Sequence, residues 1–80
     1  MDDRRSYLRQ RVLKSGSIRF NRAAGISCTV RNMSEGGACL EVASPFGIPD
    51  NFTLIIESEE VLRPCRLAWS NSNRIGVAFV

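Results

Sequence analysis

Histidine is absent from the 80 residues of this sequence, and lysine occurs only once, at Lys14. Without histidine, nucleophile systems of the Cys–His and Ser–His–Asp types are excluded, and the common zinc sites lose a principal ligand. The acidic residues are scattered, and no P-loop or dinucleotide-binding fingerprint occurs, since Gly36 and Gly37 stand alone. The sequence therefore predicts a protein that is not an enzyme and that holds no metal or cofactor.

Long hydrophobic runs are also missing. A membrane-spanning helix needs about 20 consecutive apolar residues, and no apolar run in the sequence comes close to that length. The charged N-terminus does not match a secretory signal. These features predict a cytoplasmic protein with no membrane partner. The three cysteines, Cys28, Cys39 and Cys65, are odd in number and far apart, which suits neither a disulfide framework nor a C-x-x-C motif. Each lies in an apolar stretch, so we expect free buried thiols.

Among the residues that are present, arginine dominates the positive charge. The net charge is +3, and ten of the eleven basic residues are arginines. The planar guanidinium group binds phosphates with two hydrogen bonds and stacks on bases, so this bias favours phosphate or nucleotide recognition. A GC-rich genome would produce the same bias, and the positions of the arginines have to separate these explanations.

Alternating apolar and polar residues predict an all-β fold. A β pattern begins at residue 11 and recurs at residues 28–31, 38–42, 52–57, 65–70 and 74–79. Turn signals lie at residues 14–16, 22–25, 34–37, 44–50, 58–60 and 70–73. Six strands with one apolar face each, in a chain too short for two full sheets, predict a small antiparallel barrel.

Several residues receive a specific place in this barrel. Phe52, Trp69 and Phe79 are expected to fill its interior, because each falls on the apolar side of an alternating segment. Pro64 lacks a backbone N–H and requires an edge position or a bulge at that point. Residues 1–10 are polar and charged, and we interpret them as a flexible arm that precedes a barrel domain formed by residues 11–80.

Two features of the chain point to a binding function. The arm carries Arg4, Arg5 and Arg9, which alone would be interpreted as a solvated tail. The second feature is the turn at residues 32–37, where glycine is expected to supply positive φ. Asn32 and Ser34 end the preceding strand, and their side chains are expected to point outward, where they can bind a base edge or a phosphate.

Together, the two features resemble the motifs of the PilZ domain family. Arg5 and Arg9 match its R-x-x-x-R motif, and Asn32, Ser34 and Gly37 match its [D/N]-x-S-x-x-G motif, in the same order. The resemblance covers essentially the whole chain and implies a six-stranded split barrel. PilZ domains are bacterial receptors for the second messenger cyclic di-GMP, so the resemblance implies that ligand.

The resemblance also implies a set of ligand-binding residues. These are Arg4, Arg5, Arg9, Asn32, Ser34, Gly36 and Gly37. Arg4 corresponds to the family position that is associated with a stacked pair of ligand molecules. We expect the ligand to order the arm on the barrel and so to create a surface for an effector protein of unknown identity.

Two other functions fit the same sequence. In the first, the barrel binds nucleic acid: the arm follows the backbone and exposed aromatic side chains stack on bases. Few aromatic residues are available for this, because most of them fall on the inward side of the strands. In the second, the domain keeps the PilZ fold, binds no nucleotide and serves only protein contacts.

Overall fold

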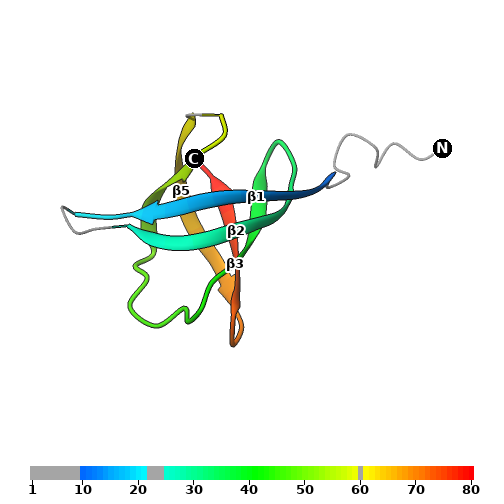
Figure 1. Ribbon diagram of the computed structural model, residues 1–80. Coiled ribbons are helices and arrows are strands. Elements are labelled where there is room, and N and C mark those ends of the chain that lie inside the picture. The colour runs from blue at the N-terminus through cyan, green and yellow to red at the C-terminus, as the bar shows by residue number, and fades with distance from the viewer. Residues whose placement is uncertain (1–9, 22–24, 60) are drawn as a thin grey trace.

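The computed structural model describes residues 10–21, 25–59 and 61–80, and this part of the chain is all-β without a helix. The strands are β1 (Gln10–Arg19), β2 (Ile26–Met33), β3 (Gly37–Glu41), β4 (Asn51–Ile56), β5 (Val61–Ser70) and β6 (Arg74–Phe79). They pair in antiparallel fashion in the order β1-β2-β3-β6-β5-β4 and close into a barrel (Figure 1). The predicted six-stranded antiparallel barrel is confirmed. The predicted arm lies outside the described residues except for Gln10, the first residue of β1.

The barrel interior is apolar, and no polar or charged residue is buried among those that the structure describes. Its members come from every strand and from the segment between β3 and β4. They are Ile18, Cys28, Val30, Ala38, Leu40, Val42, Ile48, Phe52, Leu54, Ile56, Cys65, Ile75 and Val77. The alternation therefore predicts the inward face of β3 and β4 correctly.

The thiols are free, as predicted, but only two of the three are buried. Cys28 and Cys65 lie in the core, whereas Cys39 is half-buried on the outer side of β3. Burial raises the pKa of Cys28 to about 11, and the nearby charge of Glu57 adds to the shift. Burial also raises the pKa of the Cys65 thiol to about 11. Both groups are therefore neutral at physiological pH.

The expected turn at residues 14–16 was wrong, because these residues lie inside β1. This strand closes the barrel, and Gly16 pairs with Cys28 of β2 on one side and with Ile56 of β4 on the other. A Cβ atom at Gly16 would lie 3.1 Å from the carbonyl oxygen of Ile55. The glycine therefore permits close packing where three strands meet, not a reversal of the chain.

Pro64 occupies neither an edge strand nor a bulge, which corrects the expectation for this residue. Its carbonyl oxygen accepts a hydrogen bond of 3.0 Å from the N–H of Val80, which follows the last residue of β6. The N–H and C=O of a residue in an antiparallel strand point to the same side. The missing N–H thus faces the end of β6 and removes no hydrogen bond from the β4–β5 ladder.

Among the described residues, no helix could span a membrane.

Candidate functional site

A β-bulge in β2 determines where Asn32 points. Val30 pairs with Leu40 and Asn32 pairs with Cys39, so Arg31 is an extra residue without a partner on β3. In a regular strand, Asn32 would follow Cys28 and Val30 into the core, since residues at a spacing of two share a face. The bulge turns Asn32 to the outer surface instead. The predicted outward orientation of this residue thus has a specific structural cause.

A second bulge has the same effect on β5. Leu67 pairs with Val77 and Trp69 pairs with Gly76, so Ala68 is the extra residue. Trp69 therefore lies on the outer surface, where its side chain is 47% exposed. The expectation that Trp69 fills the interior was wrong, because the bulge shifts the alternation by one residue. Of the other aromatic residues expected inside, Phe52 is buried, and Phe79 is partly buried against the core.

The two bulges place Asn32 and Trp69 at opposite ends of one row of paired residues. Asn32 pairs with Cys39, Cys39 pairs with Gly76, and Gly76 pairs with Trp69. The ends of this row are three strand spacings apart, about 14 to 15 Å between backbones. The indole ring extends back toward Asn32 and covers Gly76, since a Cβ atom at Gly76 would overlap the indole nitrogen.

Small residues between these two ends leave the outer surface hollowed. We call this space the tryptophan hollow. It is lined by Asn32, Gly36, Ala38, Cys39, Ala68, Trp69, Gly76, Val77 and Ala78. An aromatic side chain at one end and an amide at the other suit a planar group with polar edges, such as a nucleobase.

The turn after β2 fixes the position of the other predicted site residues. The N–H of Ser34 donates to the carbonyl of Gly37 at 2.8 Å, and the carbonyl of Gly36 accepts from the N–H of Phe79 at 2.8 Å. Neither glycine has positive φ, which occurs at Asn21 and Gly47 among the described residues. The conformational role predicted for these glycines was therefore wrong.

The two glycines of this turn have different surroundings. Gly37 is buried, and a Cβ atom there would overlap the carbonyl oxygen of Val77 on β6. Gly37 is therefore required because β3 and β6 approach closely at this point. Gly36 is exposed and lines the tryptophan hollow, and a Cβ atom at this residue would meet no other atom within 4 Å.

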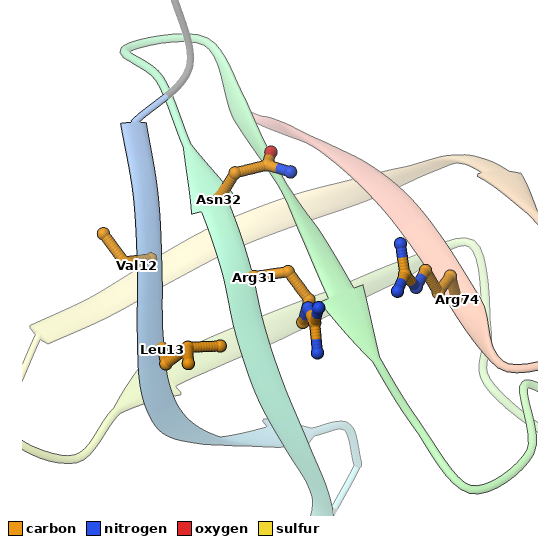
Figure 2. Close-up of a pocket in the computed structure, with 5 residues that line it drawn as sticks. All are labelled: Val12, Leu13, Arg31, Asn32 and Arg74. Carbon is orange, nitrogen blue, oxygen red and sulfur yellow. The ribbon is translucent and has the colours of Figure 1, made fainter.

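A second hollow adjoins the first, and Asn32 lines both. We call it the arginine hollow. It has a volume of about 480 Å3 and is lined by Val12, Leu13, Arg31, Asn32 and Arg74 (Figure 2). Arg31 donates a hydrogen bond of 2.9 Å to the carboxylate of Glu41 at the end of β3. Asn32 therefore lies between an aromatic and a cationic hollow on the same face of the barrel.

The arginines of the predicted site, Arg4, Arg5 and Arg9, lie outside the described residues. The backbone register still relates the two motifs, because Gln10, which follows Arg9 directly, pairs with Met33. The structure thus brings Asn32, Ser34 and Gly36 to the place where the chain of the first motif enters the barrel. Trp69, Arg31 and Arg74 were not among the residues predicted to bind a ligand. No sequence signal marks the bulge that exposes Trp69.

Comparison with known protein families identifies one matching family. A family model of the PilZ domain matches residues 3–80, a range that contains both motifs and all six strands. No curated protein matches the chain.

Proposed function

The chain belongs to the PilZ domain family, and from this premise we propose that it is a receptor domain for cyclic di-GMP. Membership alone places it in a family of cyclic di-GMP receptors that are binding modules. The observation that carries the proposal for this chain is the position of Asn32, between a hollow with an exposed tryptophan and a hollow with two arginines. Cyclic di-GMP presents guanine rings and phosphates, and these two surroundings suit both.

In the proposed complex, each group has a defined role. One guanine stacks on the indole of Trp69 in the tryptophan hollow. The amide of Asn32 and the hydroxyl of Ser34 bind a base edge or a phosphate oxygen. Arg5 and Arg9 bind phosphate and the O6 and N7 atoms of guanine, while Arg4 favours a second ligand molecule.

The arginines of the arm do not provide enough binding free energy for micromolar affinity, so the barrel surface has to contribute as well. Charge-assisted hydrogen bonds from two or three arginines contribute about 3 to 9 kcal/mol, at about 1.5 to 3 kcal/mol each. Ordering about six arm residues costs on the order of 6 to 12 kcal/mol of backbone entropy, which cancels that gain. Micromolar affinity requires a net of about −8 kcal/mol. Stacking on Trp69 and the contacts of Asn32 and Ser34 therefore have to add to the binding free energy, or the arm has to be partly ordered before the ligand binds.

Calorimetric titration with cyclic di-GMP tests the proposal directly. The wild type is expected to bind with micromolar affinity, at about −8 kcal/mol. Arg9→Ala is expected to weaken binding by about 10- to 100-fold, because a charge-assisted contact is lost, and Ser34→Ala by about 3- to 10-fold. Arg19→Ala is the matched control, since Arg19 lies at the far end of β1 and lines neither hollow.

Absence of binding to the wild type would refute the receptor proposal and leave the protein-interaction module as the better alternative. Full affinity in Arg9→Ala would refute the assignment of the arm.

Ordering of the arm can be measured separately in the same samples. Saturating ligand should slow amide hydrogen exchange at residues 4–10, and unchanged exchange would show that the ligand does not order the arm.

Trp69 provides a second, independent test, because it is the only tryptophan of the chain. Cyclic di-GMP is expected to quench its fluorescence as guanine stacks on the indole. Trp69→Leu should weaken binding by about 5- to 100-fold, since base stacking on an aromatic side chain contributes about 1 to 3 kcal/mol. Trp69→Phe keeps an aromatic face and should retain most of the affinity.

The exposed tryptophan also gives the nucleic-acid alternative one further stacking platform. Single-stranded DNA in place of cyclic di-GMP separates the two functions. Quenching by DNA with a steep dependence on salt, and none by the dinucleotide, would favour a nucleic-acid-binding barrel.

A further inference from the structure

The arginine hollow contains a charge arrangement that the two PilZ motifs do not include. Arg31 approaches from β2 and Arg74 from β6, and their guanidinium groups point toward one another across β3 (Figure 2). Arg31 is the extra residue of the β2 bulge and has no partner on β3. Arg74 is exposed and pairs in register with Glu41 of β3.

One carboxylate is paired with these two cations. Glu41 forms an ion pair of 2.9 Å with Arg31, and the described acidic residues provide no ion-pair partner for Arg74. The three side chains therefore leave one positive charge uncompensated. The ion pair is also accessible, with side chains 40% and 36% exposed for Arg31 and Glu41, and exposed pairs of this kind are weak. An incoming anion can displace the carboxylate from Arg31.

We propose that the arginine hollow is a phosphate subsite of the cyclic di-GMP site, in which Arg31 and Arg74 hold one phosphate and Glu41 competes with it for Arg31. This inference rests on the proposed function. The ligand carries two phosphates, and the arm and the arginine hollow would each bind one of them. Two guanidinium groups that approach from β2 and β6, the strands on either side of β3, suit the oxygens of a phosphate, which accept paired hydrogen bonds.

The surroundings of the two arginines support this role. Val12 and Leu13 of β1 also line the hollow, and Leu13 is 75% exposed. Because the hollow is open to water, a phosphate would be held there by charge-assisted hydrogen bonds from two guanidinium groups, which together exceed a single exposed ion pair. Asn32 joins this hollow to the tryptophan hollow, so one ligand can place a base over the indole and a phosphate between the arginines.

The competing carboxylate gives the inference a distinctive test, because two single charge removals should have opposite effects. In calorimetric titrations with cyclic di-GMP, Glu41→Gln is expected to tighten binding by about 3- to 10-fold, and Arg74→Gln to weaken it by about 10-fold. Arg74→Gln should also reduce the salt dependence of the binding constant, as loss of one phosphate contact does. A purely structural role would not give opposite signs.

Two matched controls carry the same charge changes at other places. Arg19→Gln removes a cation that lines a different hollow, and Asp50→Asn removes a carboxylate from an exposed loop residue. Both should leave the dissociation constant within about 2-fold, since separated surface charges are screened by salt. Wild-type binding with unchanged affinity in both Glu41→Gln and Arg74→Gln overturns this inference and leaves the receptor function intact. No binding by the wild type overturns both.

Discussion

Gly37→Ala is expected to destabilise the barrel by about 3 kcal/mol, because inserting a methyl group into a tightly packed site forces backbone shifts. The added Cβ atom would overlap the carbonyl oxygen of Val77, and a backbone atom within the β3–β6 ladder cannot rotate away. An 80-residue domain has a total stability on the order of 4 to 12 kcal/mol, so this is a large fraction of it. The midpoint of thermal unfolding should fall by about 12 to 24 °C.

The neighbouring glycine is the matched control for this experiment. A Cβ atom at Gly36 meets nothing within 4 Å, and this residue does not have positive φ. Gly36→Ala should therefore be neutral or stabilise the protein by up to about 1 kcal/mol, through reduced entropy of the unfolded chain. Urea unfolding of both variants measures the difference. Equal losses of stability in the two variants would contradict the close-approach explanation for Gly37.

This pair of glycines illustrates what the sequence could and could not specify. Two adjacent glycines after a strand predict a turn, and the turn is present between Met33 and Gly37. A glycine in a turn is compatible both with positive φ and with a close approach by another strand. The second explanation depends on β6, which lies about 40 residues further along the chain and pairs there only in the folded barrel. Local sequence does not contain that information.

The fold could be predicted further than the site. Alternation identifies the inward residues of β3 and β4, because these strands contain no extra residue between their paired positions and each side chain keeps its face. In β2 and β5 the same rule fails after Arg31 and Ala68, which have no partner on the neighbouring strand. Neither residue type marks a bulge. Because a bulge reverses the face of every following residue, Trp69 was assigned to the core, although it lies on the surface.

The two bulges, at which the alternation rule fails, have the same functional consequence. Each bulge turns a large or polar side chain out of the barrel, and the register brings the two side chains onto one row, separated by Cys39 and Gly76. A regular six-stranded barrel with this sequence would bury Asn32 without a polar environment and would turn Trp69 away from the outer surface. Departures from regular alternation therefore coincide with the proposed binding surface, as bulges near functional sites often do.

Loss of stability at alkaline pH is the second large effect that we expect. The pKa values of Cys28 and Cys65 are both raised from 9.0 to about 11 in the folded protein, mainly by burial. At a pH between 9 and 11, the unfolded chain has lost the thiol protons, whereas the folded chain still holds them. The free energy of unfolding therefore falls as the pH rises, by at most about 1.4 kcal/mol per pH unit for each thiol. Below pH 9 both states are protonated and this contribution is constant.

For the two thiols together, the loss between pH 9 and pH 11 is on the order of 5 kcal/mol, comparable with the whole stability of a domain of this size. Urea unfolding under reducing conditions at several pH values measures the slope. Cys28→Ala and Cys65→Ala should each remove about half of the alkaline slope, although each costs some stability at neutral pH through the small cavity it creates. Cys39→Ala keeps both buried thiols and is the matched control. The difference in slope between the wild type and each variant isolates the contribution of the substituted thiol. An identical slope in the wild type and in Cys28→Ala would show that the folded barrel does not hold the Cys28 proton more tightly than the unfolded chain does.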